Sequence, residues 1–322
     1  MKTILVTGGA GFIGCNFIRY IINKYDDYRI INLDALTYAG NLDNLVKMKD
    51  NPNYLFVKGD ISDIEAVNRV MGKGVDYIIN FAAESHVDRS IDNSNAFIKT
   101  NVMGTQVLLD AAKRYKIKKY IQISTDEVYG SLGETGYFTE KTPISPNNPY
   151  SASKASADLL VRAYYETYKL PINITRCSNN YGAYQYPEKL IPLMISRACD
   201  NKKLPVYGNG LNIRDWIHVK DHCSAIDRVL HLGKIGEVYN IGANNERNNL
   251  LIVRKIIDFL DKDESLIEFV DDRLGHDIRY AIDATKIREE LGWIPSYKFE
   301  EGIEETIKWY VNNQEWWRKI MK

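Results

Sequence analysis

The sequence predicts an α/β protein built on a doubly wound parallel sheet, with a smaller α/β substrate-binding lobe interleaved with it. Short apolar runs alternate with amphipathic helical segments through the first half of the 322-residue chain, and a glycine-rich turn follows the first run. After residue 176, proline, asparagine and glycine interrupt this pattern. Alternating strands and helices favour a parallel sheet. The change in sequence pattern after residue 176 indicates where the second lobe begins.

The expected strands are short runs rich in β-branched and aromatic residues. Near-continuous apolar runs of this length are typical of strands covered on both faces. Six of them occupy residues 4–7, 30–33, 54–57, 77–81, 120–124 and 172–176. A later run at residues 238–241 is expected to add one more strand to the same sheet.

The segments between the strands have helical periodicity. The helices expected in the first half cover residues 12–24, 64–71, 96–114 and 151–168. Those expected in the last third cover residues 250–261, 285–291 and 302–313. Residues 215–219 look like a strand entering a helix, and three tryptophans near the C-terminus are interpreted as packing or oligomer-surface residues: Trp309, Trp316 and Trp317.

The composition of the chain gives no indication of a nucleic-acid or membrane partner. Basic and acidic residues number 42 each, so no overall field attracts nucleic acid or an acidic membrane. The chain starts with a strand-like run and shows no signal peptide, and no apolar run approaches the roughly 20 residues that span a bilayer. The four cysteines are scattered, which favours reduced thiols in a cytoplasmic protein: Cys15, Cys177, Cys199 and Cys223.

The turn Gly8–Gly14 joins the first strand to the first helix. Its glycines permit the tight turn, the approach of a pyrophosphate and close helix packing, and the start of the helix attracts the anion. Asp34 ends the second strand, where a carboxylate binds an adenine ribose and repels a 2′-phosphate, so NAD is favoured over NADP. The expected cofactor-binding residues are Gly8, Gly11, Phe12, Ile13, Gly14, Asp34, Asp60, Ile61, Ala82, Ala83, Tyr150 and Lys154.

A Rossmann-type NAD-binding domain is therefore expected over residues 1–176 plus about 218–243. The remaining residues, about 177–217 plus 244–322, are expected to form the substrate-binding domain.

Tyr150 and Lys154 are four residues apart after Pro149, a plausible helix start, so both side chains project from one face. A free tyrosine has a pKa near 10, too high for an efficient base at neutral pH. A lysine cation and the positive nicotinamide ring are expected to lower that pKa. Thr125 lies just beyond the fifth strand, at the edge where such sheets bind ligands, and its hydroxyl is expected to bond the reacting oxygen.

These motifs resemble the extended short-chain dehydrogenase/reductase family. Within it the chain is similar to the nucleotide-sugar 4,6-dehydratases that act on dTDP-glucose. The matching segments run from end to end of the chain and comprise residues 8–14, 82–88, 124–130, 150–154, 176–182, 187–192, 214–216 and 275–283. The adjacent acids Asp126 and Glu127 are the specific feature, because the epimerases of the same superfamily lack two carboxylates at this point.

The resemblance implies oxidation at C4 of a hexose, elimination of water across C5 and C6, and return of the hydride to C6. Tyr150 is then the base of the oxidation, Glu127 takes the C5 proton and Asp126 protonates the leaving hydroxyl. These roles require Asp126 to be protonated and Glu127 to be ionised. The expected catalytic residues are Thr125, Asp126, Glu127, Tyr150 and Lys154.

The substrate implied by the resemblance is a nucleotide sugar, dTDP-glucose, whose diphosphate suits basic side chains. The implied substrate-binding residues are Ser85, Thr125, Asn180, Lys189, Arg214, Asn249, Arg273, His276 and Tyr280. The family also implies a homodimer through a four-helix interface that buries residues 96–114 and 151–168 of each partner.

Alternatives stay open at this stage. They are a 4-epimerase, a 4,6-dehydratase for a UDP-, GDP- or CDP-sugar, and a catalytically idle NAD-binding scaffold or sensor. His218 and His222 have the spacing of a helical metal pair, but no third ligand is evident in the sequence, so no metal is expected. Cys177, at the end of the sixth strand, is interpreted as a small buried residue.

Overall fold

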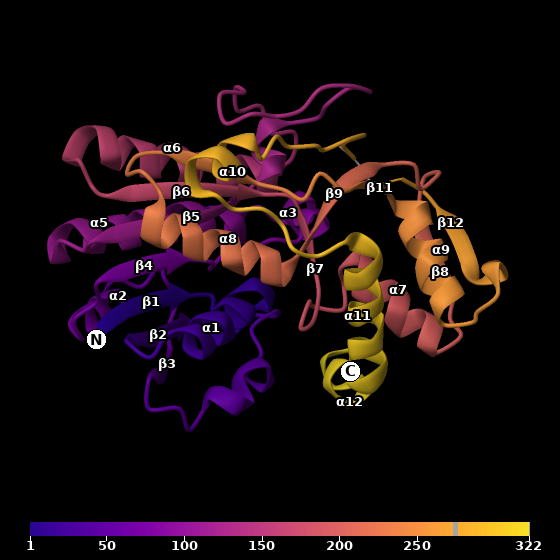
Figure 1. The fold of residues 1–322 in the computed structure, drawn as a ribbon, viewed down its shortest axis with the longest axis horizontal. Coiled ribbons are helices and arrows are strands. Elements are labelled where there is room, and N and C mark those ends of the chain that lie inside the picture. The colour runs from indigo at the N-terminus through magenta and orange to yellow at the C-terminus, as the bar shows by residue number, and fades with distance from the viewer. Residues whose placement is uncertain (273–275, 322) are drawn as a thin grey trace.

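The computed structural model describes residues 1–272 and 276–321, and a seven-stranded parallel sheet forms its centre (Figure 1). The strands lie in the order β10-β6-β5-β4-β1-β2-β3. Their bounds are β1 (Lys2–Thr7), β2 (Tyr28–Asp34), β3 (Tyr54–Lys58), β4 (Tyr77–Asn80), β5 (Lys119–Thr125), β6 (Ile172–Cys177) and β10 (Val238–Ile241). The order reverses between β1 and β4, where open sheets bind ligands beyond the carboxyl ends of their strands.

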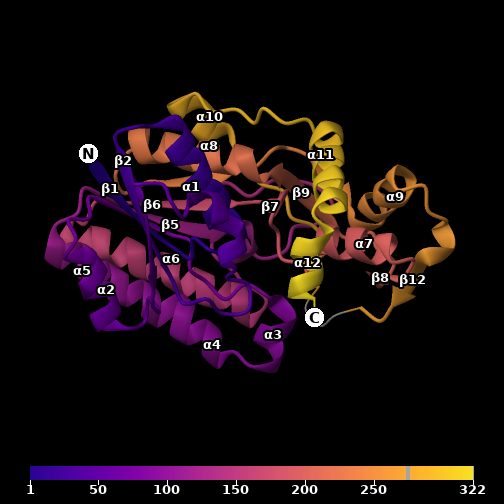
Figure 2. The same cartoon turned by 90° about the horizontal axis from the view of Figure 1, so that it is seen from below.

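Helices cover both faces of this sheet, as Figure 2 shows. One face carries α1 (Phe12–Lys24), α8 (Val219–Leu232) and α10 (Thr285–Leu291), and the other carries α2 (Ile64–Met71), α5 (Thr105–Tyr115) and α6 (Pro149–Tyr168). A separate apolar core fills each interface. Because both faces are covered, the strands are almost continuously apolar, and this is why they could be recognised in the sequence.

All seven predicted strands lie in this sheet, with bounds within two residues of those predicted. The predicted helices at 12–24, 64–71 and 285–291 coincide with α1, α2 and α10. The helix predicted at 151–168 is α6, and it begins two residues earlier at Pro149, as that proline indicated. The doubly wound fold class is therefore confirmed.

The prediction of helix at 96–114 is confirmed, but the segment is not one regular α-helix. Helical backbone is present, but α4 (Asn95–Phe97) leads into a π-helical segment (Ile98–Gly104) before α5 begins. Within that segment the buried Asn101 donates from Nδ2 to the carbonyl of Glu84 at 3.0 Å and to Ser153 Oγ at 2.8 Å. A π turn often marks a local functional requirement, which hydrophobic periodicity does not reveal.

The second lobe lies beyond the carboxyl end of the sheet and has its own core (Figure 1). It contains a three-stranded sheet, β11-β9-β7, and a two-stranded sheet, β12-β8. Its strands are β7 (Asn179–Tyr181), β8 (Leu204–Tyr207), β9 (Ile213–His218), β11 (Glu246–Asn248) and β12 (Ile267–Val270). Its helices are α7 (Leu190–Cys199), α9 (Asn249–Phe259), α11 (Phe299–Asn312) and α12 (Gln314–Ile320).

Several of these elements were not predicted. Prolines suggested a break near α7, yet Pro192 lies in the first turn of that helix, where a missing N–H is tolerated. The predicted strand-to-helix junction is β9 running directly into α8, which returns the chain to the main sheet. Trp317 is buried in the core of the second lobe, in agreement with a packing role. The domain boundaries at residues 176, 217 and 243 stay a prediction.

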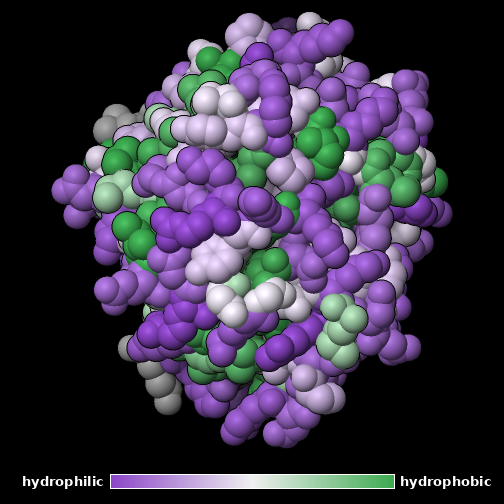
Figure 3. Space-filling view, turned by 90° about the vertical axis from the view of Figure 1, so that its left-hand side faces the viewer, coloured by the Kyte–Doolittle hydropathy of each residue, from purple (hydrophilic) through white to green (hydrophobic). Residues whose placement is uncertain are grey.

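Short helical segments complete the chain: α3 (Val87–Asp92), two 3₁₀ turns at Leu42–Met48 and Glu264–Leu266, and a third at Asp126–Tyr129. Figure 3 shows the end of the molecule opposite the second lobe, where the surface is mainly hydrophilic and hydrophobic side chains lie in small separate groups. Among the described residues, none of the helices has the length and apolar character needed to cross a membrane.

Candidate active site

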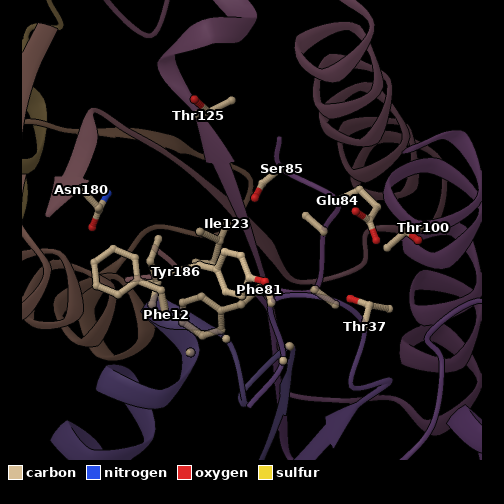
Figure 4. Close-up of a pocket in the computed structure, with 18 of the residues that line it drawn as sticks. Phe12, Thr37, Phe81, Glu84, Ser85, Thr100, Ile123, Thr125, Asn180 and Tyr186 are labelled. Atoms are coloured by element: carbon tan, nitrogen blue, oxygen red, sulfur yellow. The ribbon is translucent and has the colours of Figure 1, made fainter. Parts of the chain in front are cut away.

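A cavity of about 320 Å³ lies at the carboxyl ends of the central strands, at the point where the strand order reverses. Its walls come from the loops after β1, β2, β3, β4, β5 and β6, together with the first residues of α6. Figure 4 shows Asn180 and Tyr186 on one side of it, and Thr37, Glu84 and Thr100 on the other. Both lobes therefore contribute to one site.

The glycine turn after β1 forms the floor next to α1. Gly8 has φ +66°, and a Cβ there would lie 2.7 Å from backbone atoms of Ala82. A Cβ on Gly14 would lie 2.5 Å from the carbonyl oxygen of Gly8. The helix begins at Phe12 after Gly11, whose position carries no side-chain cap, so its first amides are suited to an anion.

Asp34 at the end of β2 orders the neighbouring backbone. Its Oδ2 accepts from the amide of Ala10 and its Oδ1 from the amide of Leu36, both at 2.8 Å. Burial raises the pKa of Asp34, and the two amides only partly offset that effect. A carboxylate has lone pairs left for ribose hydroxyls, and the remaining predicted cofactor residues line the same cavity: Phe12, Ile13, Asp60, Ile61, Ala82 and Ala83. The residues present fit a dinucleotide such as NAD.

Tyr150 and Lys154 enter the cavity from the first turns of α6. Asn148 fixes the start of that helix, because its Oδ1 accepts from the amide of Ser151 at 2.8 Å in a capping box. Tyr150 and Lys154 are both buried and line the cavity. The ammonium of Lys154 donates to the carbonyl oxygen of Ile123 on β5 at 2.7 Å.

The expectation that Lys154 and the nicotinamide ring together lower the pKa of Tyr150 stays a prediction, and the surroundings of the phenol within the protein act in the opposite direction. Burial raises the pKa of Tyr150 well above its ordinary value, and the charges of Glu127 and Asp126 add to this. The Thr125 hydroxyl lowers it in part, while the pKa of Lys154 is itself lowered by burial. A positive nicotinamide ring beside Tyr150 would oppose these effects and favour the phenolate.

The adjacent acids follow β5 in the 3₁₀ turn Asp126–Tyr129. Thr125 caps this turn: its Oγ1 accepts from the amide of Glu127 at 3.3 Å and donates to Asp126 Oδ1 at 3.2 Å. Burial raises the pKa of Asp126 well above its ordinary range, and Glu127 and Asp215 raise it further. This direction is the one required of an acid that gives up a proton at neutral pH.

The predicted substrate residues are only partly brought together. Ser85, Asn180 and Lys189 line the cavity, and Lys189 Nζ donates to the carbonyl of Ser85 at 2.9 Å. Arg273 lies outside the described residues. In the part of the chain that the structure describes, the other four predicted residues lie outside the lining of this cavity: Arg214, Asn249, His276 and Tyr280.

Arg214 and Tyr280 nevertheless lie close behind the acids. The guanidinium of Arg214 stacks 4.4 Å from the ring centre of Tyr280 and donates to the carbonyl of Asp277 at 2.9 Å. Its charge opposes the rise in the pKa of Asp126. Asn249 is the first residue of α9, and His276 Nδ1 lies 2.6 Å from an oxygen of Asp272.

Sequence reasoning missed a group of residues in the loops that border the cavity. The rings of Tyr38 and Tyr186 meet edge to face at 5.5 Å. Arg89 lies 3.8 Å from the ring centre of Tyr38 and donates to Glu188 at 3.0 Å. These contacts join the loop after β2 to the loop before α7, and loops carry no periodic signal that would have predicted them. Among the described residues there is no group of three side chains that could hold a metal ion, so His218 and His222 have no third metal-ligating residue beside them.

The doubly wound sheet, the glycine turn and the Tyr150–Lys154 pair define an extended short-chain dehydrogenase/reductase. The family model described as GDP-mannose 4,6 dehydratase matches residues 5–306. The chain belongs to that family, so the resemblance drawn from the sequence is confirmed.

Relatives with established names agree with this assignment. A dTDP-glucose 4,6-dehydratase of Xanthomonas campestris pv. campestris is 52% identical, covering 100% of this chain and 96% of that protein. The structure of a dTDP-glucose 4,6-dehydratase from Bacillus anthracis in complex with NAD is 57% identical, with a TM-score of 0.94 over 99% of this chain and 100% of that chain. A UDP-glucose 4-epimerase from Thermotoga maritima shares the fold at 28% identity, with a TM-score of 0.90 over 97% of this chain and 100% of that chain.

Proposed function

We propose that the protein is an NAD-dependent hydro-lyase, a 4,6-dehydratase that converts dTDP-glucose to dTDP-4-keto-6-deoxyglucose. The observation that carries this proposal is the position of Asp126 and Glu127 in the same cavity as Tyr150 and the glycine turn. A simple dehydrogenase needs one proton-handling group, whereas elimination of water needs an acid and a base as well. The names of the similar proteins support dTDP-glucose as the substrate.

NAD, when bound, supplies a hydride acceptor for C4 and returns the hydride to C6 within one turnover. The turn from Gly8 to Gly14 and the start of α1 would hold its pyrophosphate, and Asp34 would bind its adenine ribose. A carboxylate at Asp34 disfavours the extra phosphate of NADP.

Tyr150 accepts the proton of the C4 hydroxyl as the ketone forms, while Thr125 donates a hydrogen bond to the same oxygen. The ketone makes the neighbouring C5 proton acidic, because the carbanion left behind is an enolate. Glu127 takes that proton, and Asp126 protonates the hydroxyl that leaves C6 as water. When the hydride reaches C6, Glu127 returns a proton to C5, which saturates the C5–C6 double bond. The raised pKa of Asp126 supports this division of roles.

The diphosphate would lie on the side of the cavity formed by the second lobe. Asn180 and Lys189 line that side, and an amide donor and an ammonium both suit phosphate oxygens. Ser85 and Thr125 would border the hexose. Arg214, Asn249, Arg273, His276 and Tyr280 are kept in the proposed substrate site on the basis of the family resemblance.

A homodimer and a cytoplasmic location complete the proposal. The faces that the family buries between subunits carry exposed apolar side chains, among them Met103 and Leu159, which are 54% and 55% exposed. Exposed apolar side chains indicate a protein interface where they gather on one face, as the proposed dimer requires of these helices. The four cysteines are free thiols, as in proteins of a reducing compartment.

The test is incubation of the NAD-loaded protein with dTDP-, UDP-, GDP- and CDP-glucose, followed by mass spectrometry of the product. Loss of one water from dTDP-glucose in preference to the others is expected. A product of unchanged mass would indicate a 4-epimerase, and faster dehydration of another nucleotide sugar would reassign the base. NAD binding with no turnover of any of the four would favour a scaffold or sensor.

A further inference from the structure

His222 contacts a residue of the site without lining the cavity itself. It lies on α8 and is fully buried, with its Nδ1 2.8 Å from Oδ1 of Asn180. Asn180 belongs to β7 and lines the cavity. The spacing of His218 and His222 drew attention to this helix in the sequence, and the structure gives the second histidine a partner other than a metal.

The surrounding hydrogen bonds fix which way the Asn180 amide faces. The carbonyl oxygen of Ser178 lies 3.0 Å from the position of Asn180 Nδ2, and a carbonyl accepts from an N–H but cannot donate. Nδ2 must therefore face Ser178, which leaves Oδ1 facing the imidazole. Because Oδ1 accepts only, His222 must carry its proton on Nδ1.

The other ring nitrogen supports the same tautomer. Nε2 of His222 is buried and has no hydrogen-bond partner among the described residues. A second proton there would place an unpaired charge in the interior, which is costly. Burial accordingly lowers the pKa of His222 to about 3, so the ring is a neutral donor through Nδ1 over the physiological range.

The second hydrogen of Asn180 Nδ2 is the one left for a ligand. It is directed toward Cys177 Sγ at 3.4 Å, and sulfur is a weak acceptor. Figure 4 shows Asn180 at the wall of the cavity, across from Glu84 and Thr100. An oxygen of a bound molecule would be a better acceptor than the sulfur.

We propose that His222 is a positioning residue: its Nδ1–H holds the Asn180 amide so that Nδ2 donates to an oxygen of the nucleotide sugar. The proposal deepens the function given above and depends on it for the identity of the ligand. Without the Nδ1 donor, Asn180 is free to rotate its amide, and a ligand oxygen then meets Oδ1 instead of Nδ2. The expected effect is on substrate binding, with the chemical steps left unchanged.

The kinetic test compares three variants. His222→Leu keeps the apolar bulk but removes the donor, and it should raise KM for dTDP-glucose about tenfold, in line with the loss of one buried hydrogen bond, while kcat stays within about twofold. His222→Asn places an amide N–H near the position of Nδ1 and should restore KM to within about threefold of the wild type. His218→Leu is the matched control, since His218 is also buried on the adjoining strand and has no bond to Asn180.

A double variant with Asn180 distinguishes a positioning role of His222 from a role in general packing. Asn180→Ala and the double variant with His222→Leu should share the same KM, because the histidine acts only through that amide. An unchanged KM in His222→Leu, or effects that add in the double variant, would overturn the proposal. If dTDP-glucose is not turned over by the wild type, the proposed function fails and these kinetics do not apply.

The tautomer can be measured on the wild-type protein without any substrate. Nitrogen-15 NMR of the histidine-labelled protein observes five imidazoles, and His222 is identified by the signal that disappears in His222→Asn. A proton on Nδ1 at neutral pH is expected. A proton on Nε2 would reverse the inferred amide orientation and overturn the proposal.

Discussion

Thr125 Oγ1 lies 3.2 Å from Oδ1 of Asp126, while Oδ2 of the same carboxyl is buried and has no hydrogen-bond partner among the described residues. An ionised carboxylate in this position would leave a charge unsatisfied in the interior. Burial and the neighbouring acids Glu127 and Asp215 raise the pKa of Asp126 accordingly. The side chain is thus prepared to donate a proton from an oxygen that the protein itself does not engage.

Asp126→Asn removes that proton and keeps the shape of the side chain. Elimination of water should slow by about 10²- to 10⁴-fold, the usual contribution of a general acid, while oxidation at C4 proceeds. Rapid-quench analysis of a single turnover, together with NADH absorbance, measures the two steps separately. Elimination at the wild-type rate in this variant would remove Asp126 from the mechanism.

The pH dependence of the elimination rate in the wild type tests the role of the Asp126 carboxyl independently. Because the proton is needed, elimination should be fastest below the raised pKa of Asp126 and should slow as the pH rises through it. The slowing should be absent in Asp126→Asn. A profile that rises with pH over that range would contradict the role of Asp126 as the acid.

Glu127→Gln should retain NAD but stop exchange of the C5 proton. Glutamine has the same size but cannot accept a proton, and Glu127 lines the cavity next to the acid. Incubation in deuterated water, followed by NMR of the nucleotide sugar, measures exchange at C5. Glu134→Gln, on an exposed loop outside the cavity, is the control and should exchange normally. Exchange at the wild-type rate in Glu127→Gln would assign the base to another residue.

Tyr150→Phe should abolish NADH formation, since the phenolate oxygen is the base in the oxidation. Lys154→Met should keep some activity, but its pH–rate curve for NADH formation should move to higher pH. The reason is that the lysine cation is expected to favour the phenolate, while burial and the nearby acids raise the pKa of Tyr150. Stopped-flow absorbance over a pH series measures both variants. An undiminished NADH signal in Tyr150→Phe would exclude Tyr150 from the reaction.

The sequence was enough to predict the main sheet and one side of the site, and the reasons are physical. Gly8, Asp34, Thr125 and Tyr150 lie at the ends of regular elements, so the topology of a parallel sheet brings them to one edge once the strands are recognised. The direction in which the protein shifts the pKa of Tyr150 could not be predicted from the sequence, because it depends on burial and on which charged side chains lie near the phenol in the folded chain.

The substrate side was harder to predict. Arg214 and Tyr280 were placed in the site by resemblance alone, and they lie behind it because their distance from the cavity is set by packing between the lobes. The Tyr38–Arg89–Glu188 contacts join the loop after β2, the helix α3 and the loop before α7, which are far apart in the chain. Contacts between segments so far apart in the chain cannot be predicted from local sequence patterns.

Asp227 on α8 should contribute strongly to stability. It accepts from Lys24 Nζ at 2.6 Å and lies 2.9 Å from His231 Nδ1. Burial tends to raise the pKa of Asp227, but bonds from His231 and Lys24 outweigh it and lower the pKa, while the bond to Asp227 raises the pKa of His231. Asp227→Asn should cost about 2 kcal/mol, as expected for charge-assisted hydrogen bonds.

The pH dependence of that loss has a definite sign. The contribution of Asp227 is present above its ordinary pKa of 3.8 and lost as the pH falls through the lowered value. The contribution of His231 is present below 6.5 and lost as the pH rises through its raised value. Urea unfolding should therefore show the largest difference between wild type and Asp227→Asn from pH 4 to 6.5. The exposed Asp26→Asn is the control, and a pH-independent difference would contradict the assignment.

The most direct test of the account follows the hydrogen at C4. dTDP-glucose carrying deuterium at C4 is incubated with the NAD-loaded protein, and the product is examined by NMR and mass spectrometry. Deuterium should appear at C6 of a product that has lost water, because the same hydride leaves C4 and returns to C6 on one molecule. Deuterium that remains at C4 of an epimer, or a deoxy product without deuterium at C6, would contradict the proposed 4,6-dehydration.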